Sequence, residues 1–534
     1  MASTIARRGF LGLASAAAVI GASGGLEAAW GSSDPLSAAI SAPDYSPALV
    51  IGSGFGASVS ALRLGQAGVR VTMLERGQRW QTSPWTEVFS PNFPPDQRAS
   101  WMSGLPPLPF LQPPLPELPV QRYAGVLDSS FLAGGNPVLR GACVGGGSVV
   151  YFAALTVPQR QYFTQLYPSG VDYDSLVNVY MGRVRNMLGA SELPADLYNS
   201  APFTHSRIWD QQARAAGYQP TPLHSAFSWD VCRAELTGKA RPSATIGEAT
   251  YGNSNGVKLD LTQNYLPAAE ATGNVTVYPL HQVTAIGRDS DGRYAVSVEV
   301  LDQYGTVTRQ RTLYAGALFL GAGSIGSSSL LVRARDTGAL PHLNDSVGQG
   351  WGTNGNMVTA SLFNGGTGNT QATPLASGFY DETTGVPTAF VSGFIPTPLE
   401  TTAIETITVA FDAEHRGAFS YDRSQDAVSL SYAAGNDDEM VATVQKVQQR
   451  VDAASASGLL RPVPLGVFGD YTAHPCGGAC LGQATDLFGR VAGYDRLYVN
   501  DGALLPGNAG LAGPSLTIAA LAERNMERIA AEDF

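Results

Sequence analysis

The chain carries little charge and very few lysines. Charged residues make up 14% of its 534 residues, lysine occurs only at Lys239, Lys258 and Lys446, and the net charge at pH 7 is -11. An acidic protein offers no counter-surface to the phosphates of nucleic acids or of anionic lipids. Nucleic acid is therefore excluded as a partner, and contact with a membrane surface is expected to be transient at most.

Cysteine is scarce as well. The four cysteines, Cys143, Cys232, Cys476 and Cys480, are too few for a disulfide scaffold, and they lack the paired spacing of a zinc site. We expect no metal centre. Free thiols are favoured, with a pairing of Cys476 and Cys480 after export as the alternative.

No hydrophobic run is long enough to cross a membrane. The apolar stretch near the N-terminus, residues 13–20, falls short of the roughly 18 residues that a transmembrane helix needs. It follows Arg7-Arg8 and precedes small residues near Ala28, which is typical of a twin-arginine export signal over residues 1–33. A membrane anchor is the weaker alternative. Because twin-arginine export carries folded proteins, we expect a periplasmic or extracellular protein that folds before export.

Hydrophobic residues and glycine are abundant. A hydrophobic share of 44% and 61 glycines indicate a large, loop-rich globular enzyme, and the length favours two domains. Prolines crowd together between residues 83 and 119, where regular structure is disfavoured. We interpret this stretch as a lid over a pocket, with a packed surface excursion as the alternative.

Apolar patterns predict a nucleotide-binding fold in separated stretches of the chain. A strand, a helix and a second strand are predicted at residues 48–51, 57–66 and 69–74. A three-stranded antiparallel meander is predicted at residues 283–286, 294–301 and 306–313. A strand at residues 317–320 is followed by a helix at 325–335, and a strand at 497–499 is followed by a helix at 517–531.

We therefore predict a mixed α/β fold with two interleaved domains. A Rossmann-like FAD/NAD(P)-binding domain is assigned to residues 46–80, 251–350 and 467–534. A substrate-binding domain built on an antiparallel sheet is assigned to residues 81–250 and 351–466.

One glycine motif has the context of a dinucleotide site. Gly52-Ser53-Gly54-Phe55-Gly56-Ala57 lies between the first strand and the helix, with Gly52 in a tight turn, Gly54 where a pyrophosphate approaches, and Ala57 packed on the sheet. Glu75 ends the second strand, where a ribose hydroxyl would bind. An acidic residue there favours FAD or NAD over NADP.

A second glycine cluster follows the proline-rich stretch. Gly141, Gly145, Gly146 and Gly147, followed by Ser148, would let the backbone approach a flat ligand or a phosphate closely. By itself this cluster is only suggestive of a binding site.

The motifs, taken in order, resemble those of one flavoenzyme family. Across nearly the whole exported portion the chain is similar to the cholesterol oxidase branch of the glucose-methanol-choline (GMC) oxidoreductases. The resemblance is carried by the Gly52 motif, Gly145 to Ser148, Leu280 to Val283, Gly321 to Ser324, Gly348 to Gly352, His474 to Gly478, Gly489 to Tyr494 and Asp501 to Gly507.

The resemblance implies a noncovalently bound FAD, because no histidine lies between Gly141 and Val157 for the covalent link of some relatives. It places Glu75 at the ribose and Val283 near the adenine. The predicted cofactor-binding residues are Gly52, Gly54, Phe55, Gly56, Ala57, Glu75, Gly141, Gly145, Gly146, Gly147, Ser148, Val283, Gly323, Asp501, Gly502 and Pro514.

The resemblance also makes His474 the principal catalytic candidate. The matching family histidine faces the flavin and helps to remove the hydroxyl proton as hydride passes to flavin N5. An imidazole titrates near neutrality, so it can act as a base or as a donor to a developing alkoxide. The other histidines, at 205, 224, 281, 342 and 415, are interpreted as exposed or structural.

The chain departs from the family pattern at several positions. Gly513 stands where the family has an asparagine, and Ser392 where cholesterol oxidases have the carboxylate that moves the steroid double bond. Because of this position, Ser392 is taken with His474 and Tyr151 as a candidate catalytic residue. No acid lies between residues 384 and 399, and Glu400 and Glu405 are remote candidates. The isomerisation base is therefore expected to be absent.

Bulk around the flavin is also redistributed. Tyr151 and Phe152 replace a family asparagine and glycine, and Ala473 replaces a tyrosine. The Tyr151 hydroxyl could stand in for a lost hydrogen-bonding group, or the ring could simply fill space.

The hypothesis from the sequence is a secreted FAD-dependent oxidase of a secondary alcohol on a bulky apolar, sterol-like substrate, with O2 as acceptor and H2O2 as product, and without isomerisation. One alternative is a dehydrogenase with another acceptor, since Phe152 could block oxygen access. Another is an FAD-binding homologue with changed, non-oxidase chemistry. Neither the substrate nor the oligomeric state follows from the sequence.

Overall fold

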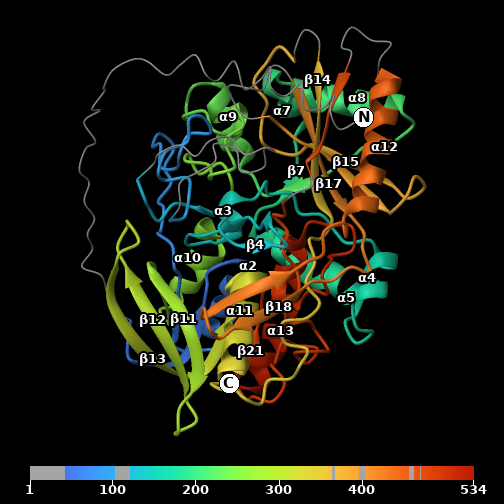
Figure 1. The fold of residues 1–534 in the computed structure, drawn as a ribbon. Helices are drawn as coiled ribbons and strands as arrows, with labels where there is room; N and C mark the ends of the chain where they lie inside the picture. Colours follow the sequence, from blue (N-terminus) through green and yellow to red (C-terminus); the bar gives the residue numbers. More distant parts are fainter. Residues whose placement is uncertain (1–41, 103–120, 364–366, 396–402, 456–461, 469–470) are drawn as a thin grey trace.

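The computed structural model describes residues 42–102, 121–363, 367–395, 403–455, 462–468 and 471–534 (Figure 1). The predicted export signal, residues 1–33, lies outside these residues, and so do residues 103–119 of the predicted lid. The described part of the lid, residues 83–102, contains no helix or strand. No helix in the described ranges is long and apolar enough to cross a membrane.

A seven-stranded sheet forms the lower half of the molecule in Figure 1. Strands β10, β2, β1, β13 and β21 pair in parallel, and β13, β12 and β11 pair antiparallel as a meander. The strands are β1 (Tyr45–Ile51), β2 (Val71–Leu74), β10 (Val275–Tyr278), β11 (His281–Arg288), β12 (Tyr294–Leu301), β13 (Val307–Leu320) and β21 (Leu497–Val499).

The two strands predicted at residues 306–313 and 317–320 are one continuous strand, β13. Its first part pairs with β12, and its last three residues pair with β21 on the same edge, while β1 occupies the other edge. Gly316 lies in the middle, where a Cβ atom would be 3.1 Å from the carbonyl oxygen of Pro47. The absence of that atom lets β1 approach, so the meander and the parallel sheet share a strand.

Helices packed on this sheet come from both ends of the chain. Helix α2 (Phe55–Gln66) packs against α13 (Pro514–Glu532) and α10 (Tyr265–Glu270), and α11 (Gly323–Thr337) packs against β11. The buried carboxylate of Glu523 in α13 accepts hydrogen bonds from Arg63 in α2 at 2.7 and 2.8 Å and from the Tyr265 hydroxyl at 2.8 Å. A buried charge that is fully paired in this way fixes the three helices relative to one another.

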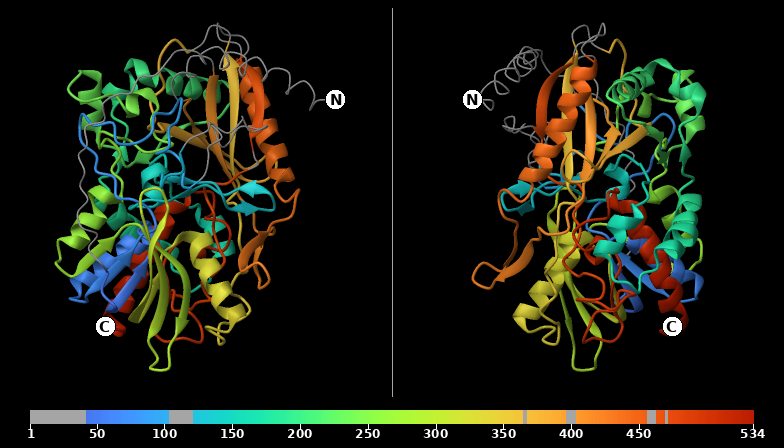
Figure 2. Two further views of the ribbon diagram at one scale, coloured as in Figure 1. Left: turned by 60° about the vertical axis from the view of Figure 1, so that its left-hand side comes forward. Right: turned by 90° about the vertical axis from the view of Figure 1, so that its right-hand side faces the viewer.

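A six-stranded antiparallel sheet forms the second half, which lies above the first in Figure 1. Its order is β20, β14, β17, β16, β15 and β8, with β8 (Thr221–Pro222), β14 (Asn356–Phe363), β15 (Ser377–Asp381), β16 (Thr388–Ser392), β17 (Ala403–Ala410) and β20 (Pro462–Phe468). Helix α12 (Asp438–Ser455) runs along one face, as Figure 2 shows, and α8 (Thr204–Ala215) packs there too. The opposite face is left for a cavity.

The remaining elements are short. They are the strands β3 (Leu127–Asp128), β4 (Leu132–Ala133), β5 (Asn136–Pro137), β6 (Arg140–Gly141), β7 (Ser191–Glu192), β9 (His224–Ser225), β18 (Ala418–Asp422) and β19 (Ala427–Ser431), and the helices α3 (Gly147–Val150), α4 (Arg160–Leu166), α5 (Tyr173–Ser175), α6 (Gly182–Met187), α7 (Ala195–Tyr198) and α9 (Trp229–Leu236).

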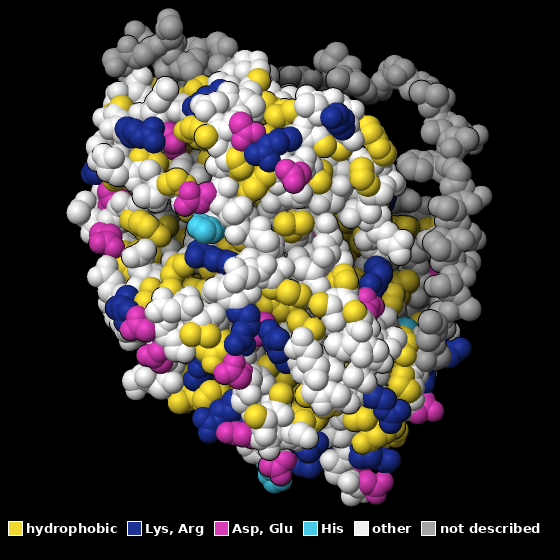
Figure 3. Space-filling view, turned by 180° about the vertical axis from the view of Figure 1, so that it is seen from behind, with side chains coloured by type: hydrophobic (Ala, Val, Ile, Leu, Met, Phe, Trp, Pro, Cys, Tyr) yellow, Lys and Arg dark blue, Asp and Glu magenta, His cyan; other side chains and the backbone are white. Residues whose placement is uncertain are grey.

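The surface seen from behind carries acidic and basic side chains close together (Figure 3). Over the described surface, exposed ion pairs such as Arg160 with Asp174 and Arg233 with Asp196 join opposite charges. The net negative charge therefore does not gather into one field on this face. All four cysteines are buried free thiols.

The fold makes a prediction about Gly56. A Cβ atom there would lie 1.7 Å from the carbonyl oxygen of Asn500, which follows β21, and backbone cannot swing away as a flexible side chain can. We expect Gly56→Ala to lower the free energy of unfolding by about 3 kcal/mol. Gly182→Ala is the matched control, because Gly182 is helical with open space around it, and this change should raise stability by about 0.5–1 kcal/mol. Urea unfolding followed by circular dichroism measures the free energy of unfolding of both variants and of the parent protein. A Gly56→Ala variant as stable as the parent protein would contradict the packing described.

Candidate active site

A cavity of about 730 Å³ lies between the two sheets. Its lining comes from the carboxyl ends of the parallel strands, including Ile51, Leu74 and Gly321, and from the free face of the second sheet, including Val358 and Ile407. Ligands bind outside the carboxyl ends of strands in open α/β sheets. The geometry therefore combines a nucleotide site and an apolar chamber in one space.

The two glycine segments meet at the nucleotide end of this cavity. A Cβ atom on Gly146 would lie 3.0 Å from the Cα atom of Gly54, and one on Gly141 would lie 2.4 Å from the carbonyl carbon of Gly146. Gly54 has open space beside it. It directly precedes α2, and no side chain caps the N-terminus of that helix. The first N–H groups of α2 are thus available to a phosphate.

Glu75 and Ser53 complete this end. Glu75 lies at the end of β2, where one carboxylate oxygen accepts from the Ser53 hydroxyl at 2.7 Å and the other from the Gly77 amide at 2.9 Å. Burial raises the pKa of Glu75, against these hydrogen bonds. The Ser53 hydroxyl also accepts from the amide of Gly145 at 3.0 Å, so it links the two glycine segments. This link was not predicted from the sequence.

Positive charge also lines the cavity. Arg76 and Arg140 both pair with the buried Asp128, at 2.8 and 2.5 Å, which leaves one net positive charge among the three groups. Although burial raises the pKa of Asp128, the two arginines hold it well below its usual range. The Nε atom of Arg140 is buried without a partner in the described part of the chain. A diphosphate in the cavity would balance the net positive charge.

Most of the predicted cofactor-binding residues line the cavity. They are Gly52, Gly54, Phe55, Gly56, Glu75, Gly141, Gly146, Gly147, Val283, Gly323, Asp501, Gly502 and Pro514. Ala57, Gly145 and Ser148 stand behind the lining instead. Ala57 packs on Gly321, and the Ser148 hydroxyl donates to the Gly145 carbonyl at 2.7 Å and accepts from the Leu261 amide. These three support the glycine segments, and the binding roles themselves stay predictions.

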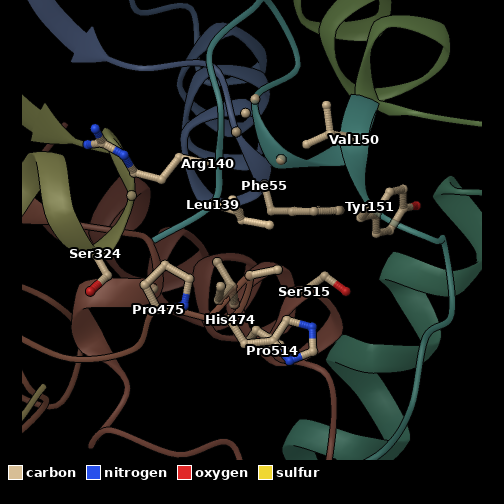
Figure 4. Close-up of a pocket in the computed structure, with 18 of the residues that line it drawn as sticks. Phe55, Leu139, Arg140, Val150, Tyr151, Ser324, His474, Pro475, Pro514 and Ser515 are labelled. Carbon is tan, nitrogen blue, oxygen red and sulfur yellow. The ribbon is translucent and has the colours of Figure 1, made fainter. Parts of the chain in front are cut away.

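His474 and Tyr151 are brought to the same cavity, whereas Ser392 is not. In Figure 4, Phe55 and Tyr151 lie on one side and His474 and Pro514 on the other. Ser392 lies on β16 with its side chain on the opposite face of the sheet, where its hydroxyl accepts from the amides of Ala376 and Ser377. The side chains of a strand alternate between faces, so the structure corrects the placement of Ser392 as a catalytic candidate.

The orientation of His474 follows from Asn354. The Asn354 side-chain oxygen accepts from the Ala509 amide at 2.7 Å, and its nitrogen donates to the Ala512 carbonyl at 2.9 Å. These contacts fix which end of the amide is the donor. The same nitrogen lies 3.4 Å from Nδ1 of His474, so Nδ1 is the acceptor and the ring proton belongs on Nε2. Burial lowers the pKa of His474 to about 4, so the ring is neutral at pH 7.

Tyr151 offers an unused hydroxyl. Its hydroxyl is buried without a hydrogen-bond partner among the described residues, and burial raises its pKa well above the usual range. The ring packs edge-on against Phe55, with centroids 5.4 Å apart. Lys258 donates to the carbonyl oxygens of Val149 and Tyr151, each at 2.7 Å, and so anchors this segment from behind. A buried hydroxyl without a partner is costly, which favours the polar interpretation of Tyr151 over space filling.

Glu405 also lines the cavity. From the sequence, Glu405 was predicted to be only a remote candidate, because it lies beyond the position that aligns with the family carboxylate. On β17, Glu405 shares its face with Ile407 and Val409, which both line the cavity, whereas Thr406 on the other face accepts from the Trp209 indole. Burial raises the pKa of Glu405 to about 8. The strand register, invisible in one sequence, is what brings this carboxyl into the chamber.

Comparison with known proteins decides the family. Models of the GMC oxidoreductases match residues 47–349 with their N-terminal domain and residues 417–522 with their C-terminal domain. The chain belongs to the GMC oxidoreductase family. This GMC oxidoreductase is thus an enzyme acting on CH–OH donors, of a family that depends on flavin, generally FAD, and the predicted fold class and family resemblance are confirmed.

Relatives of this GMC oxidoreductase include a cholesterol oxidase of Mycobacterium tuberculosis (strain ATCC 25618 / H37Rv), 28% identical over 90% of each chain. A cholesterol oxidase of Acinetobacter baumannii is 23% identical over 91% of this chain and 94% of its own. Among solved structures, pyridoxine 4-oxidase from Mesorbium loti matches 90% of this chain and 99% of its own, with a TM-score of 0.62 and 16% identity. A fungal aryl-alcohol oxidase matches 92% and 100%, with a TM-score of 0.61 and 15% identity. These two structures show the fold alone.

The Asn354 contact makes a prediction about pH. In Asn354→Asp, a carboxylate beside Nδ1 would stabilise the imidazolium, so the pKa of His474 should rise from about 4 toward neutrality. The pH at which the rate of anaerobic flavin reduction changes should move upward with it. Asn344→Asp, a substitution of a surface asparagine that bonds to Gln483, is the control and should leave the profile unchanged. An unmoved profile in Asn354→Asp, with folding intact, would contradict the assigned contact.

Proposed function

We propose that the protein is an FAD-dependent oxidase of a secondary alcohol on a bulky apolar, sterol-like substrate. The overall reaction converts the alcohol and O2 into a ketone and H2O2. The observation that carries the proposal is the apolar chamber, walled by Phe152, Leu375, Phe394 and Ile407, that adjoins His474 within the same cavity. The similarity to two cholesterol oxidases supports the same substrate class.

The residues present fit a bound FAD. The α2 N-terminus and the Arg76–Arg140 pair would hold the diphosphate, Glu75 the ribose, and Gly146, Gly147 and the Asp501–Gly502 segment the flavin end. When bound, FAD supplies the acceptor for two electrons. We propose noncovalent binding, because no histidine lies between residues 141 and 157. Acid precipitation should therefore release all the yellow colour into the supernatant; colour retained in the pellet would contradict noncovalent binding.

His474 orients the reacting hydroxyl in this proposal. Since Asn354 favours the tautomer with the proton on Nε2, the ring can donate that proton in a hydrogen bond to the substrate oxygen and so hold the alcohol in a fixed orientation. Tyr151 also lines the cavity, across from His474. We propose that oxidation occurs without movement of a double bond, because Ser392 carries no acid and faces the opposite side of the sheet. Glu405 does line the cavity, but the register of β17 places it about 13 Å of strand away from the position opposite Asn356, which contacts the residue before His474.

A dehydrogenase that passes electrons to another acceptor is the second candidate. Phe152 lines the cavity and packs edge-on against Phe394, with centroids 5.0 Å apart. Two rings held in this way could limit the access of O2 to the flavin end. Fast reduction of a dye with negligible oxygen uptake would single out this candidate.

The test of the proposed function is anaerobic mixing of the yellow protein with cholesterol, smaller hydroxysteroids and terpenoid alcohols. Flavin absorbance should bleach with at least one secondary alcohol, and H2O2 should accumulate on return to air. His474→Ala should slow bleaching by about 10²–10⁴-fold. His342→Ala, which changes an exposed histidine, is the control. No bleaching with any alcohol, in protein that holds its flavin, would overturn the proposal and favour the changed chemistry.

A further inference from the structure

The apolar chamber contains one carboxyl group that the proposed oxidation does not use. Glu405 lies on the cavity face of β17, among the apolar residues Val391, Phe394 and Ile407. Its side chain makes no hydrogen bond or ion pair with any residue that the structure describes, and burial alone raises its pKa, to about 8. A buried polar group without a partner is costly, and one that faces a cavity can recover the cost from a ligand.

Glu405 lies at the end of the chamber away from His474. The strand register places Val409 opposite Asn356, and the Asn356 side chain accepts from the amide of Ala473, next to His474. Glu405 is four residues further along β17, which corresponds to about 13 Å of strand. A ligand whose hydroxyl lies beside His474 would therefore need a rigid body on the order of 10 Å long to reach the carboxyl.

The chemistry around Glu405 favours a neutral oxygen as its partner. With a pKa of about 8 the carboxyl is mostly protonated at pH 7, so it can donate one hydrogen bond and accept others. The walls near it are apolar apart from Tyr471, whose pKa is raised by burial and by the charge of Glu405. An ammonium group brought there would have to shed its water to form a buried ion pair. Moving a carbonyl or hydroxyl group from water into the chamber costs less free energy than moving an ammonium group. Such a group can also pair with the protonated acid, which both donates and accepts hydrogen bonds.

We propose that Glu405 binds a second oxygen-bearing group of the substrate, at the end remote from the hydroxyl that is oxidised. The substrate class is thus narrowed to rigid apolar alcohols with a carbonyl or a second hydroxyl at the far end. This inference rests on the proposed function for the position of the reacting hydroxyl, and it assigns the specificity of the same chamber.

Matched ligands and two variants test this inference. Pairs of rigid steroid-like ketones, which the flavin cannot oxidise further, are compared with and without a second oxygen at the far end, and their dissociation constants are read from the perturbation of flavin absorbance. In the parent protein the second oxygen should tighten binding about tenfold, the value of one buried hydrogen bond. Glu405→Leu should abolish that preference and leave the plain ketone unaffected. Glu405→Gln, which keeps a donor and an acceptor, should retain most of it.

The pH dependence of ketone binding is an independent test. Above a pH of about 8 the carboxyl loses its proton and can no longer donate, so the preference for a far carbonyl should fall, and Glu405→Gln should remove this pH dependence. An equal preference in the parent protein and Glu405→Leu would overturn the inference, and so would tighter binding of a far ammonium group. Flavin content and melting temperature establish that each variant is folded, and the near-isosteric Glu405→Gln keeps the test decisive if Glu405→Leu does not fold.

The failure of this inference and that of the proposed function are distinguishable. If ketones show the Glu405-dependent preference but no alcohol bleaches the flavin, the oxidation is wrong and the binding role stands. If alcohols bleach the flavin and no Glu405-dependent preference exists, the binding role is wrong and the oxidation stands.

Discussion

The structure depends on the close contact of backbone segments that lie far apart in the chain. Gly54, Gly146 and the Asn500–Asp501 segment meet where the parallel strands end, at distances that a side chain on Gly56 or Gly146 would prevent. This contact gathers the N-terminus of α2, the glycine segment that leads into α3, and Asp501 around one space. This arrangement is stabilised by Glu523 in α13, which accepts two hydrogen bonds from Arg63 in α2. Binding of a flat dinucleotide follows from this constraint, since the gap it leaves is lined by backbone donors.

The second sheet adds specificity to this site. One of its faces is closed by α8 and α12, so its other face is free to form the wall of the chamber. The alternation of side chains along β17 gives this wall its character: Ile407 and Val409 make it apolar, and Glu405 adds an acid to it. Asn354 joins the two halves, because it contacts Ala509 and Ala512 on one side and His474 on the other. In the proposed function, redox chemistry and substrate choice are therefore supported by different sheets around one cavity.

Much of the nucleotide end could be predicted from the sequence, because its signals are local. The spacing of Gly52, Gly54 and Ala57 and the acid at Glu75 have a meaning within about 25 residues of chain, and the helices and strands around them were predicted to within a few residues. His474 was found through family motifs, and it does lie in the cavity, although its catalytic role and the domain boundaries stay predictions.

The features that were missed depend on contacts between distant residues. The charge shared by Arg76, Arg140 and Asp128, and the amide orientation of Asn354, have no local pattern. Ser392 and Glu405 show the limit most clearly. Alignment by position pointed to Ser392, but the pleat turns its side chain away, while the paired strand brings Glu405 inward. A register that one sequence does not reveal therefore reverses which residue faces the substrate.

The central claim is that one cavity holds FAD at its glycine-lined end and an apolar alcohol in the adjoining chamber, with His474 at the boundary. A crystal structure of the protein with its flavin and a bound ketone tests this claim most directly. The account predicts the flavin ring between the Gly146–Gly147 backbone and the Asp501–Gly502 segment, with the ketone oxygen within hydrogen-bonding distance of Nε2 of His474. A flavin ring bound elsewhere, or a ketone whose oxygen points away from His474, would contradict it.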